Sequence, residues 1–332
     1  MRALIALLAT AVLLGVVYVG VGLAGQEWLF GIVVPYIAIA VFLIGLVYRI
    51  LLWAGAPVPY RIPTTCGQQK TLPWLKQNRL DNPSSLPGVL GRMALEVLLF
   101  RSLFRNTRVE LTPLKRLVYQ SDKLLWAAAL AFHWSFLIVF LRHLRFFLEP
   151  TPALIGFLET WDGFFQLTVP TFLLTDALIT VGLLFLLARR LYDRQVRYIS
   201  LPADYFALFL LLGVAISGIF MRYVTKVDLA AVKELCVGLV TLSPVLPTDR
   251  IVGLPFYIHL FLVCVLFAYF PISKLMHMGG VFLSPTRNLA NNNRMRRHVN
   301  ADNPEVEAHT YEQWEDEFRD KLKACGIATE RE

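Results

Sequence analysis

Long apolar stretches, each of about twenty residues, alternate with polar connections along the chain. A helix of that length crosses the hydrocarbon core of a bilayer, so the pattern predicts an all-α integral membrane protein. Six transmembrane helices are expected to form one bundle. The predicted spans are Leu4–Ala24, Trp28–Trp53, Leu124–Leu148, Phe164–Leu191, Ala203–Val224 and Leu254–His277.

Composition supports this class. Hydrophobic residues make up 56% of the chain and the mean hydropathy is +0.56, values that exclude an ordinary soluble protein. The first span is similar to a signal peptide, because Arg2 precedes it and small residues follow it. A second span begins within a few residues, and we therefore expect the first to be retained as a transmembrane helix.

Lysine and arginine are concentrated in the long connection between the second and third spans and in the short one between the fourth and fifth. Residues 25–27 and 149–163, which join other spans, contain none. The positive-inside rule then places both termini in the cytoplasm and predicts a multi-pass protein of the inner (cytoplasmic) membrane. The net charge of +8 follows from this topology and from attraction to membrane lipid, and it requires no nucleic acid.

The pattern divides the chain into four parts. We expect a transmembrane hairpin (1–53), a basic cytoplasmic loop (54–122), a four-helix membrane domain (123–278) and a cytoplasmic tail (279–332). Within the loop, Leu86–Asn106 is predicted to form an amphipathic helix that lies on the inner leaflet or docks a partner. The tail changes from basic to acidic, which suits either a partner-binding segment or an ordinary capping helix.

Four of the six histidines lie in two apolar helices. His133 and His143 are ten residues apart, and His259 and His277 are eighteen residues apart. Ten residues rise about 15 Å and eighteen about 27 Å, and each spacing keeps its pair on one helix face. If the two helices are antiparallel, His133 faces His277 near the cytoplasm and His143 faces His259 near the outside. Helix tilt or local unwinding must absorb the difference between the two rises.

Paired neutral imidazoles are the axial ligands of a b-type haem. Ionisable side chains at membrane depth are costly and usually functional, which favours this use over simple packing or snorkelling of the histidines. A zinc or di-metal site would need all four within a few ångströms of each other, whereas the spacing spreads them across the bilayer. We therefore predict two haems b: an inner one held by His133 and His277, and an outer one held by His143 and His259.

Further polar residues fall near the outer pair. Arg142 and Arg145 flank His143 and would either bind haem propionates or extend toward the headgroups. Asp162 and Gln166, at the outer start of the fourth span, are candidates for binding a quinol, although Asp162 also suits a helix cap. Asp176 lies near the middle of that span, so its carboxylate should face the bundle interior and have a partner.

The order and spacing of the histidines, with the sequence Pro271-Ile-Ser-Lys-Leu-Met-His277, resemble the di-haem cytochrome b of the respiratory nitrate reductase gamma subunit family. The likeness covers roughly Trp28 to His277. The first span, the basic loop and the tail depart from that family, and together with the stretch LEVLLFRSLFRNT they resemble DsrM-type membrane cytochromes of the sulfite-reduction-associated (Dsr) complex.

These resemblances imply an electron-transfer subunit of a quinol oxidoreductase, incomplete as an enzyme alone. They imply menaquinol (menaquinone when oxidised) as electron donor, and as acceptor a cytoplasmic iron–sulfur subunit similar to heterodisulfide reductase, in dissimilatory sulfur metabolism. They are also compatible with further membrane subunits and periplasmic cytochrome subunits. Cytochromes of other heterodisulfide- or nitrate-reductase-type complexes share the pattern. Two other classes compete: a proton-coupled transporter with Asp176 in a relay, and an anchor that holds a soluble subunit.

Overall fold

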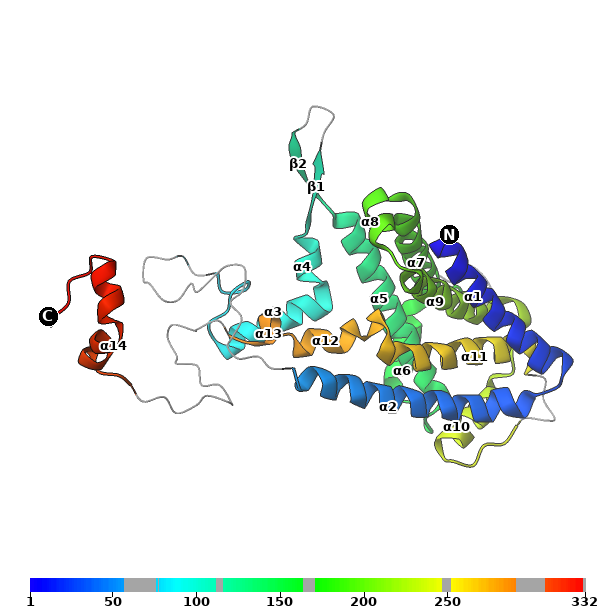
Figure 1. Ribbon diagram of the computed structural model, residues 1–332. Helices are drawn as coiled ribbons and strands as arrows, with labels where there is room; N and C mark the ends of the chain where they lie inside the picture. The colour runs from blue at the N-terminus through cyan, green and yellow to red at the C-terminus, as the bar shows by residue number, and fades with distance from the viewer. Residues whose placement is uncertain are drawn as a thin grey trace.

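The computed structural model describes residues 1–56, 76, 78–111, 116–163, 171–246, 252–290 and 308–330, and nearly all regular structure in these ranges is helical (Figure 1). Five helical segments are long and apolar enough to cross a membrane. They comprise α1 (Arg2–Val17) with η1 (Tyr18–Leu23), η2 (Leu29–Val33) with α2 (Val34–Ala54), α5 (Lys123–His143) with η3 (Leu144–Phe146), α9 (Pro202–Phe220) with η4 (Met221–Thr225), and α11 (Gly253–Tyr269) with η5 (Phe270–Ile272).

The predicted fourth span differs from its expected form. Its helix, α7 (Leu174–Tyr192), begins ten residues later than Phe164, and residues 164–170, including Gln166, lie outside the described residues. The predicted start at Asp162 is wrong, because Asp162 ends a separate short helix, α6 (Ala153–Asp162). Asp176, Arg189 and Arg190 shorten the uncharged part of α7, so five rather than six helices in the described part of the chain have the composition of a span.

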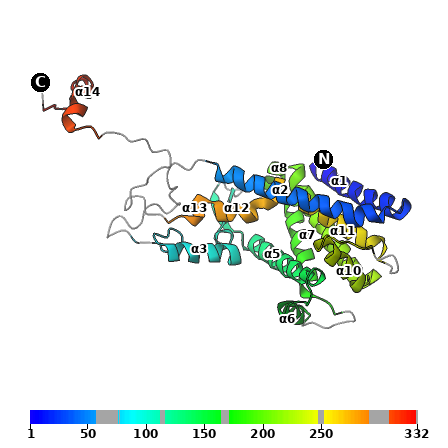
Figure 2. The ribbon, with the colours of Figure 1, turned by 90° about the horizontal axis from the view of Figure 1, so that it is seen from below.

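The helices pack as a bundle in which α7 lies between α5 and α9, and α11 lies between α9 and α2 (Figures 1 and 2). Helix α1 packs along α9, so the N-terminal hairpin is part of the bundle. Close approach of α5 and α7 depends on Gly182, where an added Cβ would lie 3.0 Å from Phe132 Cβ and 3.2 Å from the Ala128 carbonyl oxygen. An apolar core therefore continues from the hairpin through the histidine-bearing helices.

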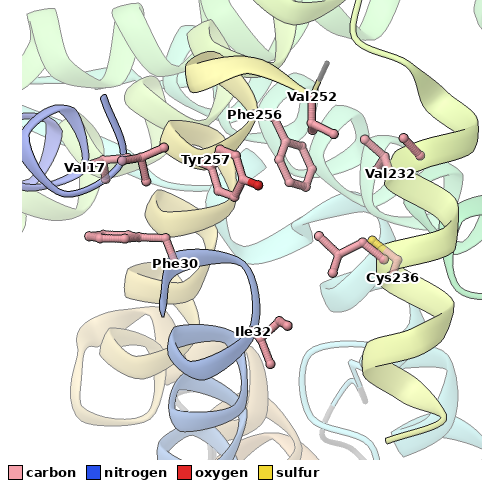
Figure 3. Packing of buried hydrophobic residues seen from close by; sticks show 11 residues of the cluster. Val17, Phe30, Ile32, Val232, Cys236, Val252, Phe256 and Tyr257 are labelled. Carbon is pink, nitrogen blue, oxygen red and sulfur yellow. The ribbon is translucent and has the colours of Figure 1, made fainter. Parts of the chain in front are cut away.

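The two ends of the bundle, called inner and outer here after the predicted topology, are built from different elements. At the outer end, α1, η2, the surface helix α10 (Leu229–Val240) and α11 contribute to one buried cluster that includes Val17, Phe30, Val232 and Phe256 (Figure 3). Burial raises the pKa of the Cys236 thiol in α10 to about 12, which keeps it protonated at neutral pH. At the inner end, Arg2 Nη1 donates to the Ser200 carbonyl at 2.9 Å, which fixes the N-terminus beside α8 (Arg194–Ile199).

The basic loop between α2 and α5 is more structured than the sequence predicts. The amphipathic segment forms α3 (Leu86–Leu99) and α4 (Arg101–Phe104). A hairpin not predicted from the sequence follows, in which β1 (Thr107–Leu111) pairs antiparallel with β2 (Leu117–Ser121). Burial alone would raise the pKa of Asp81, but hydrogen bonds from the Arg101 and Arg105 guanidinium groups lower it to about 2, so this carboxylate ties α4 to the start of α3.

The last elements continue from α11. Two tight turns, η5 and η6 (Lys274–Met276), lead into α12 (His277–Leu283) and α13 (Pro285–Asn288). The tail contains α14 (Tyr311–Ala324), which begins with a capping box formed by Thr310 and Gln313. Helices α3, α12 and α13 lie together beyond the inner end of the bundle (Figure 2).

A buried ion pair joins three helices at the outer end. Arg142 Nη1 of α5 donates to Asp162 Oδ2 at 2.6 Å, and the two side chains are 12% and 3% exposed. Asp162 also accepts from the Thr175 backbone N–H at 2.9 Å and from the Thr175 hydroxyl at 2.6 Å. Asp162 thus satisfies two donors in the first turn of α7, where the backbone N–H groups have no partner within the helix.

Replacing Asp162 by alanine should lower the free energy of unfolding by about 3 kcal/mol, because the buried Arg142 guanidinium then keeps only the more distant Glu159 carboxylate, 3.8 Å from its Nε. The matched control is Glu149→Ala, which removes an exposed partner of Lys233 and should cost less than about 1 kcal/mol. Thermal unfolding of the purified proteins in detergent measures both. Equal stability of the two variants would contradict a structural role for the Arg142–Asp162 pair.

Candidate functional site

The structure brings the four membrane histidines together as two separate pairs. The ring centroids of His133 and His277 are 6.0 Å apart with the ring planes at 82°, and those of His143 and His259 are 6.2 Å apart at 19°. In each pair, one histidine comes from α5 and the other from the α11–α12 segment. As expected for the predicted antiparallel arrangement, His133 lies opposite His277 and His143 lies opposite His259.

Local unwinding reconciles the unequal spacings of the two pairs. After α11, the chain passes through η5 and η6, and His277 is the first residue of α12. The Ser273 hydroxyl donates to the Phe270 carbonyl at 3.0 Å and accepts from the Leu275 N–H at 3.1 Å. Proline at position 271 has no N–H to donate, so the regular helical bonding is interrupted there. The two bonds of the Ser273 hydroxyl satisfy backbone groups where the helix ends. His277 consequently leaves the line of α11 and faces His133.

The remaining motif residues anchor this turn. Lys274 Nζ lies 2.8 Å from Asp204 Oδ1 in the first turn of α9. Pro271 packs against Gly45 of α2, where an added Cβ would lie 2.9 Å from Pro271 Cβ. The sequence Pro-Ile-Ser-Lys-Leu-Met-His thus fixes the position of His277 through packing, a hydroxyl cap and an ion pair.

Every one of the four imidazoles is oriented through its Nδ1 atom. His133 and His143 each contact a carbonyl oxygen four residues earlier, on Ala129 and Val139, at 2.7 Å. His277 Nδ1 contacts the Lys274 carbonyl at 2.8 Å. A carbonyl oxygen only accepts, so Nδ1 carries the proton in these three rings and Nε2 keeps its lone pair.

His259 has a side-chain partner instead. Its Nδ1 lies 3.0 Å from Ser217 Oγ, and that hydroxyl donates to the Val214 carbonyl at 3.0 Å, which leaves the hydroxyl oxygen to accept from His259. Metal-ligating histidines are held in this way, with the second ring nitrogen donating to a carbonyl or a polar side chain. Ser217 was missed in the sequence because it is one hydroxyl in an apolar helix, and only the fold places it beside His259.

The residues fit a haem iron between the rings of each pair. A metal–imidazole bond is about 2 Å long and the nitrogen lies about 1.1 Å from its ring centroid, so two axial imidazoles have centroids about 6 Å apart. Both pairs have this separation. Gly218 leaves space beside the outer pair, where an added Cβ would lie 3.2 Å from His259 Cε1. No group of three or more metal-binding side chains occurs among the described residues.

Arg142 and Arg145 both contact carboxylates of α6. Arg142 pairs with Asp162, and Arg145 forms two hydrogen bonds with Glu159, one of them at 2.9 Å between Nη2 and Oε2. Their predicted role as propionate ligands stays a prediction. Arg222 in η4, like Arg142, has a buried Nε without a hydrogen-bond partner in the described part of the chain. This donor, one turn beyond Gly218, was not singled out from the sequence.

The two carboxylates considered for quinol chemistry differ in their surroundings. Asp162 accepts hydrogen bonds on both oxygens, as described above. Asp176 accepts from the Tyr223 hydroxyl at 2.8 Å, which confirms that this carboxylate has a partner. Its predicted place near the middle of the span is wrong, because Asp176 lies in the first turn of α7. Tyr223 was missed in the sequence because it lies far from Asp176 along the chain and carries no motif. The quinol-binding roles of Asp162 and Gln166 stay predictions.

Comparisons with known proteins show the family of this chain. Residues 88–297 match the family described as the nitrate reductase gamma subunit. The chain is 45% identical over 281 residues to a protein of Archaeoglobus fulgidus named "Hdr-like menaquinol oxidoreductase cytochrome b-like subunit", covering 83% of this chain and 84% of the relative. An Archaeoglobus profundus protein of the same name is 41% identical over 279 residues, covering 82% of each chain.

The family match includes α5, the α11–α12 segment and the motif that ends at His277. It leaves out α1 and α2, although α2 supports Pro271 through Gly45. The extra hairpin is thus packed on the family core. With more than half of its length matched and with its histidine pairs so arranged, the chain belongs to the nitrate reductase gamma subunit family.

Proposed function

We propose that this chain is the membrane cytochrome b subunit of a menaquinol oxidoreductase that delivers electrons to a cytoplasmic iron–sulfur partner. The observation that carries the proposal is the two pairs of imidazoles, each spaced for one iron and each with its Nδ1 held. Membership in the family implies haem. The number of haems, the residues that bind them and the direction of electron flow are part of the proposal.

The inner site would hold a haem b between His133 and His277, and the outer site another between His143 and His259. Bound in this way, each haem supplies a one-electron carrier whose potential depends on its ligands and surroundings. The protein contributes neutral imidazoles of fixed tautomer on helices α5, α11 and α12. In this proposal α7 completes a sixth crossing of the membrane, since it packs between two helices that have the composition of spans.

Single histidine replacements test the ligand assignment. His133→Ala and His277→Ala should each remove the inner haem, and His143→Ala and His259→Ala the outer one, leaving about half of the haem iron because one of two sites is lost. Haem content and the oxidised and dithionite-reduced visible spectra of the purified complex measure this. His309→Ala, in the tail, is the matched control and should keep both haems.

Two low-spin haems in all four variants would overturn the ligand assignment. A colourless wild-type protein would overturn the cytochrome proposal itself and favour the transporter or the anchor.

We place quinol oxidation near the outer pair, on the side opposite the cytoplasmic acceptor. Oxidation of a quinol releases protons, so the site needs a group that can accept or hold one within reach of the quinol hydroxyl. Asp162 and Gln166 were the candidates from the sequence. Asp162 is occupied by Arg142 and Thr175, whereas Asp176 has one neutral donor, Tyr223. The geometry therefore supports Asp176 over Asp162 as the proton-accepting carboxylate.

Rates of haem reduction by a menaquinol analogue distinguish these residues. Asp176→Asn should slow reduction at least tenfold, because an amide cannot take the proton. Asp162→Asn keeps an acceptor for Thr175 and should slow it less. Dithionite reduction of each variant is the control for intact haems. Quinol-driven reduction that survives loss of the outer haem, in His143→Ala, would contradict the outer location.

The partner is proposed from the relatives and from the charge of the inner end. The printed name of both relatives refers to an Hdr-like oxidoreductase, which suits an iron–sulfur partner similar to heterodisulfide reductase. The DsrM-type resemblance adds dissimilatory sulfur metabolism and further membrane or periplasmic cytochrome subunits. Arg105, Arg108 and Lys123 lie in the segment that leads into α5. Arg105 and Arg108 are paired with Asp81 and Asp193, so of these three cations Lys123 is the one that we propose to face an acidic partner surface.

Removal of the tail tests docking. Truncation after Leu289 keeps α13, which contacts α3 and would be lost by a cut before it. Both haems should remain, because their four proposed ligands are retained, while co-purification of the iron–sulfur partner should weaken. A shorter truncation after Ala324 serves as control and should keep the partner. An unchanged complex after the Leu289 cut would show that the tail is not a docking element.

A further inference from the structure

Helices α3 and α4, with Phe100 between them, form a strap (Leu86–Phe104) that lies against the inner histidine pair. The amphipathic segment was expected to lie on the leaflet or to wait for a partner. Instead, its last turn is bound to α5 by two indole groups: Trp126 Nε1 donates to the Leu99 carbonyl at 2.8 Å and Trp134 Nε1 to the Leu98 carbonyl at 3.0 Å. Carbonyls in the last turn of a helix have no partner within it, and the indoles supply one.

Phe100 is the residue of the strap that reaches the site. Its ring lies edge-on to His133, with centroids 5.0 Å apart and ring planes at 86°. Its backbone is left-handed, with φ at 49° and ψ at 47°. A bulky residue with a side chain seldom adopts this conformation, and such outliers persist where surrounding contacts impose them. The two indole bonds just before Phe100 are contacts of that kind.

The strap is also fastened to the segment that carries His277. Arg287 of α13 lies ten residues beyond His277, and its Nη1 contacts Glu96 Oε1 and Ser102 Oγ, both at 2.6 Å. Ser102 in turn donates to Glu96 Oε2 through its N–H at 3.1 Å and its hydroxyl at 2.7 Å. This cluster joins α3, α4 and α13. The strap is therefore bound both to α5, which carries His133, and to the segment that follows His277.

Building on the proposed function, we propose that Phe100 is a positioning residue of the inner haem site, held there by Trp126, Trp134 and the Glu96–Arg287 pair. Its ring covers His133 and excludes water from the imidazole and from its bond to the Ala129 carbonyl. Low local polarity disfavours the more highly charged oxidised state of a haem, so this cover raises the reduction potential of the inner site. The nearest ring to His143 at the outer site, Phe146 at 5.9 Å, belongs to the segment continuous with α5 and forms no strap.

Equilibrium redox titration of the haems in the intact complex tests the proposal. In Phe100→Ala, water reaches His133, so at the wild-type midpoint of the inner haem the ratio of oxidised to reduced haem should rise about tenfold, a shift of about 59 mV. The outer haem should be unchanged. Phe100→Leu keeps an apolar side chain and should shift the inner haem less. Leu90→Ala, on the exposed face of α3, is the matched control and should shift neither.

Phe100→Gly separates the ring from the backbone, because glycine adopts a left-handed conformation without cost. The ring argument requires Gly and Ala variants to shift alike. Arg287→Ala should give a smaller shift in the same direction and should make the strap more accessible to limited proteolysis, a measurement that needs no haem. Loss of the inner haem alone from Phe100→Ala, with Leu90→Ala intact, would also place Phe100 in the inner site.

Two outcomes decide between the inferences. Unchanged inner potentials in both Phe100→Ala and Phe100→Gly, with two haems present, would overturn the role of the strap and leave the cytochrome proposal standing. Absence of haem from the wild-type complex would overturn the cytochrome proposal, whatever the strap variants do in proteolysis.

Discussion

The hydrogen bond at Nδ1 of each membrane histidine is the interaction on which the site depends. An imidazole at membrane depth carries a donor that apolar surroundings cannot satisfy, and an unmade bond there costs several kcal/mol. A carbonyl of the same segment, or Ser217 in the case of His259, removes that cost. The same bond fixes the ring and directs the other nitrogen toward the facing helix. Stability and readiness to bind a metal therefore come from one contact.

That constraint explains why the last apolar segment is broken. A straight helix from His259 to His277 would rise about 27 Å, whereas the facing pair on α5 is separated by about 15 Å along its axis. The turns η5 and η6 end the helix near Pro271 and redirect the chain, with Ser273 satisfying the exposed backbone groups. Lys274 then anchors the turn on Asp204. In this motif the proline ends the helix, the serine satisfies backbone groups and the lysine anchors the turn on α9.

The sequence predicted what depends on period and spacing. The apolar stretches and the pairing of the histidines need only helical geometry, and both follow from positions along the chain. Asp162 was misplaced because its donors, Arg142 and Thr175, are distant in sequence, and a carboxylate that caps another helix has no local signature. The β1–β2 hairpin is two short strands beside long helices, too brief for alternation to stand out. Phe100 was counted as one apolar residue of an amphipathic helix, and its contact with His133 appears only when Trp126 and Trp134 bind the end of α3.

The two ends of the bundle are closed by different chemistry, and this bears on what each end can do. At the outer end, Asp162 and Glu159 neutralise Arg142 and Arg145, so these guanidiniums are occupied before any acidic group of a cofactor arrives. Arg142 and Arg222 each keep a buried Nε without a hydrogen-bond partner among the described residues. At the inner end, the ring of Phe100 contacts His133, while the ion pairs Arg287–Glu96 and Lys274–Asp204 hold the strap and the turn before His277. The charged side chains at the outer end thus form a network of ion pairs and hydrogen bonds, and a quinol bound as proposed would rearrange it. At the inner pair, His133 is instead met by two aromatic ring edges, from Phe100 of the strap and from Phe132 of α5.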